Sequence, residues 1–337
     1  RSMQARSTRP VQTFSIGFHE QGFDEAPHAK AVARHLGTDH TELYVTTAQA
    51  QSVIPRLPSM YDEPFSDSSQ IPTFLVSQLA RRHVTVSLSG DAGDELFCGY
   101  TRYGFAAHLW KSISAAPLPV RRLAARGITR VPVASWNRLA RTLGPCLPRA
   151  MRFANTGDKL HKGAQIMASA SLDAVYLGLV SHWDDPAALV IGGHEPHTLL
   201  RGAAPVLAGL GSVERMMALD TLTYLPDDIL VKVDRAAMSV SLETRVPFLD
   251  HRVIEFAARL PLALKLRDGA SKWALRQVLY RYVPQALIER PKMGFGVPIG
   301  DWLRGPLRDW AETLLAESRL RSEGFFAPAL LRTCWRE

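Results

Sequence analysis

Cysteine is scarce in this 337-residue sequence, which has Cys98, Cys146 and Cys334 and no Cys-x-x-Cys pair. A disulfide framework and a structural zinc site are therefore not expected, and we interpret all three as reduced, buried thiols of a cytoplasmic protein. No apolar run approaches the ~20 residues that cross a bilayer, and the first residues lack the basic-then-apolar order of a signal peptide. These absences predict a soluble protein with no membrane partner.

Acidic residues are nearly absent from one long segment. The formal net charge is +8, and twelve Lys or Arg residues between Arg102 and Lys162 stand against one acid, Asp158. Such a segment suits an acidic partner, a membrane surface, nucleic acid or another domain of the same protein. Because no aromatic-interleaved basic motif accompanies the charge, nucleic acid is not expected as a partner.

Strands and helices are predicted to alternate over the first hundred residues. Strand patterns cover residues 13–18, 41–45 and 84–88, and helical patterns cover 29–36, 47–57 and 72–82. This alternation predicts the α/β class, with a parallel sheet flanked by helices. After residue 100 the strand patterns disappear, and an all-helical second half is expected to follow.

An acid-rich loop, LSGDAGDELFCGY, leaves the third predicted strand and enters a predicted helix. Gly90 and Gly93 let backbone amides approach a ligand, and amides at a helix N-terminus favour anions. The side chains of Asp91, Asp94 and Glu95 would nevertheless repel a phosphate, so a bridging Mg²⁺ is implied. The alternative is a helix start in which acids stabilise the first turn. The chain has no G-x-x-x-x-G-K-[ST] phosphate loop.

The loop resembles the Leu-Ser-Gly-[Asp/Glu]-Gly-[Gly/Ser]-Asp-Glu-[Leu/Val]-Phe-x-Gly-Tyr signature of asparagine synthetases. Further segments resemble the same family in the same order. They are TFSIGF (13–18), YDEPFSD (61–67), IPT (71–73), VKVDRAAM (231–238), LETRVPFLD (242–250), KWALR (272–276) and PKMGFGVP (291–298). The chain is similar to the C-terminal synthetase domain of glutamine-hydrolysing asparagine synthetases over nearly its whole length.

Three departures from the family pattern stand out. The Ser-Gly-Gly-x-Asp-Ser-Ser pyrophosphate loop belongs just upstream of Met3 and is not in this sequence, and neither is the N-terminal glutaminase domain. The last residues also end early, so we expect a fragment that is inactive alone. Within the signature, Ala92 stands where a glycine is usual, which would strain the loop if a positive φ is needed there.

The resemblance implies a fold of the adenine nucleotide alpha hydrolase-like, ATP-pyrophosphatase type, followed by a mostly helical second half. Residues 1–104 would form its α/β nucleotide-binding part and 212–337 its helical part, with a variable Arg-rich helical segment at 105–211. It also implies ATP and Mg²⁺ as cofactors, and aspartate and glutamine-derived ammonia as substrates joined through a β-aspartyl-AMP intermediate. The absent glutaminase domain would be a partner, and a homodimer is left open.

Two other readings of the function remain open. A related adenylating enzyme would amidate another acid, close a β-lactam or cyclise a peptide. A catalytically incomplete interaction fragment would have no activity of its own.

The resemblance assigns nucleotide and metal contacts to five residues. Asp94 is expected to bind Mg²⁺ alongside an aspartate of the missing loop, and Glu95 is the alternative candidate for a metal ligand. Ser89 and Gly90 are expected to contact the nucleotide through backbone groups, and Ile16 to contact the adenine.

Two residues are candidates for catalysis. Lys272, expected to follow an N-cap at Ser271, would stabilise charge on the α-phosphate, or would be a solvated surface lysine. Asp91 would take a proton from the incoming amine, or would cap the loop.

Three residues are candidate walls of the acyl-adenylate pocket. Tyr100 and Glu243 are expected near the acyl-adenylate, where related enzymes use a Tyr–Glu pair to deprotonate an amine. Arg245 would bind a substrate carboxylate or would brace the structure through an ion pair.

Overall fold

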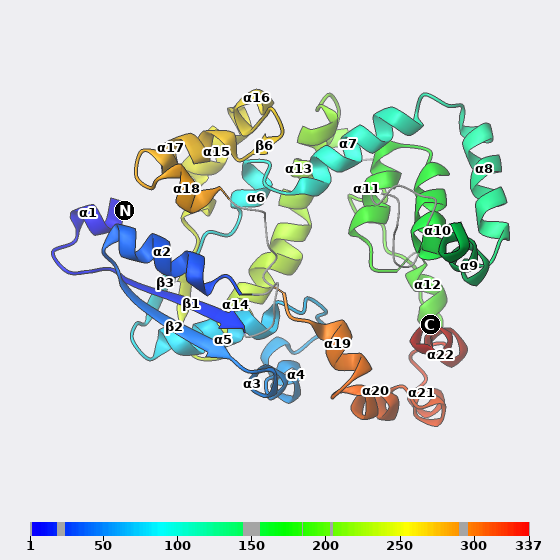
Figure 1. Ribbon diagram of the computed structural model, residues 1–337, viewed down its shortest axis with the longest axis horizontal. Helices are drawn as coiled ribbons and strands as arrows, with labels where there is room; N and C mark the ends of the chain where they lie inside the picture. Colours follow the sequence, from blue (N-terminus) through cyan, green and yellow to red (C-terminus); the bar gives the residue numbers. More distant parts are fainter. Residues whose placement is uncertain are drawn as a thin grey trace. The chain divides into compact units, whose positions relative to one another are not determined.

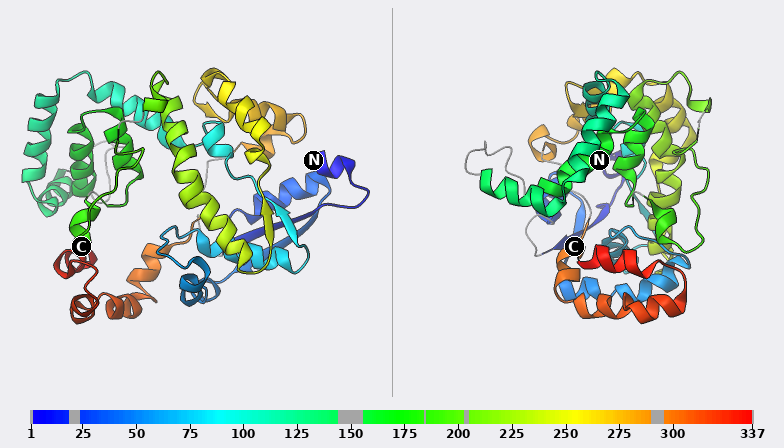
Figure 2. Two further views of the ribbon diagram at one scale, coloured as in Figure 1. Left: turned by 180° about the vertical axis from the view of Figure 1, so that it is seen from behind. Right: turned by 90° about the vertical axis from the view of Figure 1, so that its right-hand side faces the viewer.

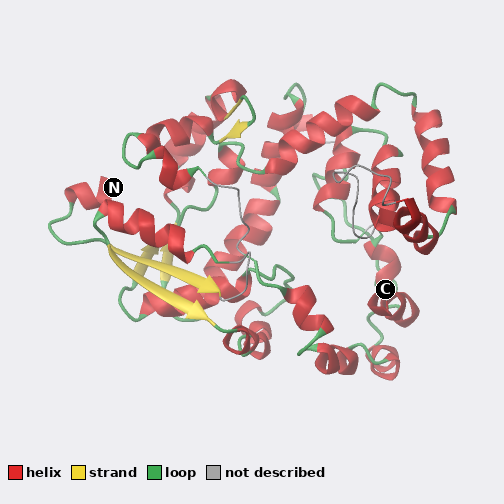
Figure 3. Cartoon of the chain, viewed as in Figure 1, coloured by secondary structure: helices red, strands yellow, loops and turns green. Residues whose placement is uncertain are grey.

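The computed structural model describes residues 2–18, 24–143, 156–183, 185–202, 205–289 and 296–336. Helices predominate over short strands (Figure 3). The chain forms two compact units. The first unit comprises residues 1–99 and 220–337, and the second comprises residues 100–219.

Strands and helices alternate at the start of the first unit, as the sequence predicts. The elements are α1 (Ser2–Arg6), β1 (Gln12–Phe18), α2 (Ala26–Leu36), β2 (Asp39–Val45), α3 (Thr47–Gln51), η1 (Ile54–Arg56), α4 (Leu57–Tyr61), α5 (Gln70–Arg81), β3 (Val86–Leu88) and α6 (Gly93–Leu96). The helix expected at 47–57 is wrong as a single element. Pro55 and Pro58 lack the amide hydrogen that a helix interior needs, and the segment divides into three short pieces.

The later part of the first unit is mainly helical. Its elements are η5 (Leu225–Leu230, one stretch of π-helix), α14 (Val231–Met238), β4 (Glu243–Arg245), η6 (Pro247–Leu249), α15 (His251–Arg259), α16 (Leu262–Lys265), β5 (Leu266–Arg267), β6 (Ala270–Ser271), α17 (Trp273–Tyr280), α18 (Gln285–Ile288), α19 (Ile299–Arg304), α20 (Arg308–Leu314), α21 (Glu317–Glu323) and α22 (Pro328–Arg336). The expectation of a mostly helical second half is therefore confirmed, but an all-helical one is wrong, because three short strands lie within it.

The second unit is helical over its described residues. It contains α7 (Thr101–Ile113), α8 (Leu118–Arg130), α9 (Val133–Leu143), α10 (Thr156–Met167), α11 (Leu172–Val180), α12 (Pro186–Leu189) and η4 (Pro205–Leu207), and α13 (Ser212–Leu222) joins it to the first unit. Tyr103 and Tyr176 are fully buried in this unit.

Four strands of the first unit form two parallel pairs. β1 pairs with β2 from Gln12↔Asp39 to Phe18↔Val45, and α2 makes the connection between them (Figure 1). β3 pairs with β4 in parallel over three residues (Figure 2, left). Parallel strands are thus confirmed, but among the described residues they form two separate two-stranded ladders rather than one sheet. β5 and β6 form a third, antiparallel pair.

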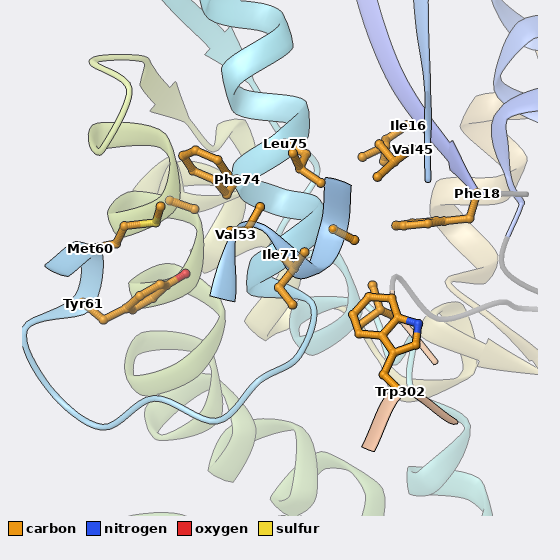
Figure 4. Close-up of a cluster of buried hydrophobic side chains, with 13 residues drawn as sticks. Ile16, Phe18, Val45, Val53, Met60, Tyr61, Ile71, Phe74, Leu75 and Trp302 are labelled. Atoms are coloured by element: carbon orange, nitrogen blue, oxygen red, sulfur yellow. The ribbon is translucent and has the colours of Figure 1, made fainter. Parts of the chain in front are cut away.

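A buried cluster lies between β1, β2 and α5. Leu75 of α5 points toward Ile16 and Val45 of the strands, whereas Phe74 lies on the other side of that helix, toward Met60 (Figure 4). Trp302 of α19 belongs to the same cluster. Burial of these apolar side chains stabilises the strand ends from which the next loops leave. α14 packs against α5. Because α5 contacts β1 and α14 contacts β4, these two helices connect the two ladders.

The cysteines only partly match expectation. Cys98 is buried, and burial raises the pKa of its thiol to about 11. Cys334 is exposed, so its predicted burial is wrong, and Cys146 lies outside the described residues. Within the described part of the chain, no helix combines the length and apolar character that crossing a membrane would need.

Candidate active site

The loop after β3 begins as an extension of the ladder. The Ser89 amide donates to the Arg245 carbonyl at 3.0 Å, which continues the β3–β4 pairing by one residue. The Ser89 hydroxyl donates to Asp91 Oδ2 at 2.5 Å. Asp91 therefore makes a contact within the loop, which agrees with the loop-capping role, one of the two roles proposed for it from the sequence. Gly90 is exposed and has no atom within 4 Å of the position of a Cβ, so its backbone is accessible.

The next turn is built on a left-handed residue. Ala92 has φ 65° and immediately precedes α6. An alanine in this region costs about 1–2 kcal/mol relative to its preferred conformations. The sequence comparison with the signature, which has glycine here, indicated this strain. The Ala92 side chain is buried in an apolar cluster with Leu96, Phe97 and Leu225.

α6 presents its two acids to different surroundings. The side chain of Asp94 is 26% exposed, whereas Glu95 is 1% exposed. Among the described residues, no three His, Cys, Asp or Glu side chains converge as a metal cluster. Mg²⁺ usually keeps several waters and is held by one or two carboxylates together with substrate phosphates. Asp94 suits such a single-carboxylate site, and the burial of Glu95 makes it the poorer of the two candidates.

Asp94 and Lys272 meet although they come from segments far apart in the sequence. Lys272 Nζ lies 2.9 Å from Asp94 Oδ2, and 31% of the lysine side chain is exposed. The Lys272 amide donates to the Phe97 carbonyl at 3.2 Å, and the residue has φ 53° at the start of α17. The expected N-cap at Ser271 is wrong, because Ser271 pairs in β6 and Lys272 itself occupies the cap position.

Gly99 makes room for this contact. A Cβ on Gly99 would overlap Asp94 Oδ1 and Lys272 Cε, and it would lie 2.8 Å from Asp94 Cα. The Gly99 amide donates to the Asp94 carbonyl at 2.7 Å. The turn after α6 thus holds Asp94 by its backbone and leaves space for the lysine. The sequence analysis missed this residue, although it is the glycine before Tyr100 in the signature.

The predicted pocket residues are divided between the two units. Glu243 and Arg245 lie on β4 and form an ion pair of 2.7 Å, with side chains 54% and 65% exposed. A pair this exposed stabilises by at most about 1 kcal/mol. Tyr100 belongs to the second unit, where the Arg102 guanidinium lies 4.0 Å above its ring.

A groove of about 1990 Å³ runs along the first unit. It is lined by residues of β1 and β3, by Ser89 and Asp91 of the loop, and by Lys232 of α14. Asp94 and Lys272 are not among its lining residues. Ile16, the expected adenine contact, is buried in the core and lines a second cavity of about 590 Å³. Thus Ser89 and Asp91 share the large groove, whereas Ile16 does not.

A buried charge network beside the groove was also missed. Lys232 Nζ donates to Asp67 Oδ2 and to the Ser69 hydroxyl, both at 2.8 Å. Burial raises the pKa of Asp67, but Lys232 and the hydrogen bonds from Ser69 outweigh burial and hold that pKa below its usual value. The paired charges in two matched segments, YDEPFSD and VKVDRAAM, were the available sequence signal. This network ties the loop before α5 to α14.

We expect the Lys232→Met substitution to lower the free energy of unfolding at pH 7 by about 3 kcal/mol, because the Asp67 carboxylate, with its side chain only 21% exposed, would be left without its partner. A depressed pKa stabilises the fold above the unfolded value of about 4 and ceases to do so as pH falls through the folded value. The gap to the wild type should therefore narrow as pH falls below about 4. Urea unfolding at several pH values measures this difference in the free energy of unfolding between the variant and the wild type. The double variant Asp67→Asn/Lys232→Met should be the more stable of the two, and an equal loss would contradict this account.

The basic segment has both structural and exposed members. Arg121 of α8 is buried and donates to the carbonyls of Met167 and Ser169 at 2.9 and 2.8 Å. Arg102 donates to the Tyr176 hydroxyl at 3.1 Å. Arg122 and Arg126 are exposed. Part of the positive charge therefore supports the packing of the second unit, and Arg122 and Arg126 are among the described basic residues that face solvent.

Comparison with known proteins gives consistent matches. The family model described as asparagine synthase matches residues 1–337. A putative glutamine-hydrolysing asparagine synthetase of Mycobacterium tuberculosis is 36% identical over 91% of this chain and 44% of that protein. Asparagine synthetase [glutamine-hydrolyzing] 1 of Bacillus subtilis is 29% identical over 92% of the chain and 46% of that protein. The amidase chyE of Penicillium rubens is 21% identical over 94% and 48%. The chain spans a little less than half the length of these curated relatives.

Proposed function

The chain belongs to the asparagine synthase family, and we propose that it is the ATP-dependent, amide-forming part of a protein that makes asparagine from aspartate. The acid would be activated as β-aspartyl-AMP, and ammonia would then displace AMP. Because the relatives are about twice as long, the glutaminase domain that would supply ammonia from glutamine is part of the proposal.

The contact between Asp94 and Lys272 is the observation that supports this proposal best. It joins the acid-rich loop after β3 to the start of α17, and both segments match the family pattern. A carboxylate for a metal and an ammonium for a phosphate then stand within 2.9 Å of each other. Transfer of an adenylyl group needs both, because negative charge accumulates on the α-phosphate and on the departing pyrophosphate.

Each residue has a defined task in the proposed first step. A carboxylate oxygen of aspartate attacks the α-phosphorus, and the bond from that phosphorus to pyrophosphate breaks. The exposed backbone of Gly90, with Ser89, would contact the nucleotide, and Lys272 would stabilise the charge on the α-phosphate. Mg²⁺ held by Asp94 and the polyphosphate would neutralise the leaving group.

The second step forms the amide bond. Ammonia attacks the acyl carbon of the intermediate, and the carbon–oxygen bond to AMP breaks. The nitrogen must lose a proton as the amide forms. Asp91 would accept it after releasing the Ser89 hydroxyl, which donates to it at 2.5 Å.

The test is pyrophosphate release by the full-length protein. With MgATP and ammonium, aspartate should trigger release and asparagine should accumulate in equal amount. Glutamate and other amino-acid carboxylates serve as comparison substrates. Release with another acid but none with aspartate would overturn the assignment of the substrate while leaving the adenylation intact.

A second acceptor class is favoured by one specific observation. The relative named as an amidase covers 94% of this chain, although it is only 21% identical. The same adenylating site could therefore serve the amidation of a different acid, or the closure of a β-lactam or a cyclic peptide. Release that depends on such an acid and does not need aspartate would decide for this alternative.

A further inference from the structure

Asp94 and Lys272 form an ion pair through the same atoms that the proposed function needs for its ligands. The proposed function needs the Asp94 oxygen for a metal ion and the Lys272 ammonium for a phosphate. In the structure, Asp94 Oδ2 and Lys272 Nζ are 2.9 Å apart and so neutralise each other. A ligand that takes either group must first separate the pair.

The pair is held by its surroundings on both sides. The Asp94 carbonyl accepts the Gly99 amide at 2.7 Å, and the Lys272 amide is anchored on the Phe97 carbonyl at 3.2 Å. Gly99 leaves no spare room beside the two side chains. With 26% and 31% of the side chains exposed, the charges are partly shielded from water, so they attract more strongly than a surface pair does.

We propose that this ion pair is an exchange lock that makes the metal ion and the polyphosphate bind together; the proposal rests on the function above. A metal ion alone would have to displace a cation and leave the ammonium beside new positive charge. An anion alone would leave the carboxylate beside new negative charge. When both arrive, Asp94 goes to the metal and Lys272 goes to the phosphate, and each charge regains an opposite partner. The coupling is reciprocal by thermodynamic linkage.

Binding of Mn²⁺, as a spectroscopic substitute for Mg²⁺, and of inorganic pyrophosphate tests the lock without ATP or aspartate. In the full-length protein, pyrophosphate should tighten Mn²⁺ binding by about tenfold or more, and Mn²⁺ should tighten pyrophosphate binding by the same factor. Calorimetry and the electron paramagnetic resonance of free Mn²⁺ measure both.

Two single substitutions should each tighten the binding of one of the two ligands. Lys272→Met removes the competing cation and should tighten the binding of Mn²⁺ alone by about tenfold, while Asp94→Asn should tighten metal-free binding of pyrophosphate by a similar factor. The matched control is Lys30→Met, which removes a lysine from another ion pair of 3.0 Å, with Glu42, and should change neither affinity.

Three outcomes would overturn the lock. They are independent binding of Mn²⁺ and pyrophosphate in the wild type, no gain in Mn²⁺ affinity in Lys272→Met, and no binding in any variant. Thermal unfolding checks that each variant is folded. If Lys272→Met does not fold, the pyrophosphate affinity of Asp94→Asn still tests the proposal. Aspartate-dependent pyrophosphate release is measured separately, so failure of the lock and failure of the proposed function are distinguishable.

Discussion

Replacing Asp94 with Asn is expected to slow aspartate-dependent pyrophosphate release by about 10³-fold or more while leaving the fold intact. The change keeps the size of the side chain and removes the negative charge that would hold Mg²⁺. Loss of one charge-neutralising group at a phosphoryl transition state typically has effects of this size. The Asp94 side chain is partly exposed and lies beside Lys272, so the amide can still accept a hydrogen bond from the lysine.

The measurement is the initial rate of pyrophosphate release at saturating ATP over a range of Mg²⁺ concentrations. Asp268→Asn is the matched control, because Asp268 lies in the turn between β5 and β6 with its side chain 96% exposed. Its φ of 51° is one that asparagine tolerates well. The control should keep the wild-type rate. Wild-type pyrophosphate release by Asp94→Asn would remove Asp94 from the metal site.

The fold was predictable where the structure is local. The strands at β1 and β2 and the helix α5 carry their own apolar pattern, and each was placed within about two residues of its observed ends. β4 was not predictable in this way. It has only three residues, too few for a clear period-2 pattern. Its partner β3 lies far upstream in the sequence, so no connecting turn indicates the pairing either.

The resemblance proposed residues for the candidate site, but the sequence did not predict how they lie relative to one another. The resemblance singled out Asp94 and Lys272, but nothing in the sequence shows that they form an ion pair. Lys272 has a left-handed backbone and its amide donates to the Phe97 carbonyl, a contact made only after the chain has folded. Pro291 to Phe295 of the last matching segment lie outside the described residues, so any role of that part stays a prediction.

The ion pair between Asp67 and Lys232 could not be predicted from the sequence for a similar reason. Asp67 and Lys232 each look like ordinary surface charges in the sequence, and their partnership becomes visible only when α14 packs against the start of α5. A lysine between two valines, as in Val231-Lys232-Val233, was the one local hint of burial. Pairs of opposite charges in separate matched segments therefore merit a search even when no chemistry requires them.

Gly99→Ala is expected to reduce the rate of pyrophosphate release by about 10²–10³-fold, the scale of losing one positioned donor at the transition state. The added methyl group would overlap both members of the Asp94–Lys272 pair, and the Asp94 Cα at 2.8 Å cannot swing aside as a side chain can. The backbone must therefore shift, which should also lower the free energy of unfolding by about 1–3 kcal/mol.

Gly104→Ala is the matched control, because a Cβ there has no atom within 4 Å and the residue lies within α7. In a helix interior, alanine is about 0.5–1 kcal/mol more favourable than glycine, so this control should be at least as stable as the wild type. The double variant Gly99→Ala/Asp94→Asn then separates a site effect from general damage. If Gly99 acts only by placing Asp94 and Lys272, the double variant should be little slower than Asp94→Asn alone, because residues that share one contact are not additive. If the rate loss of the double variant equalled the product of the two single losses, Gly99 would act elsewhere in the fold.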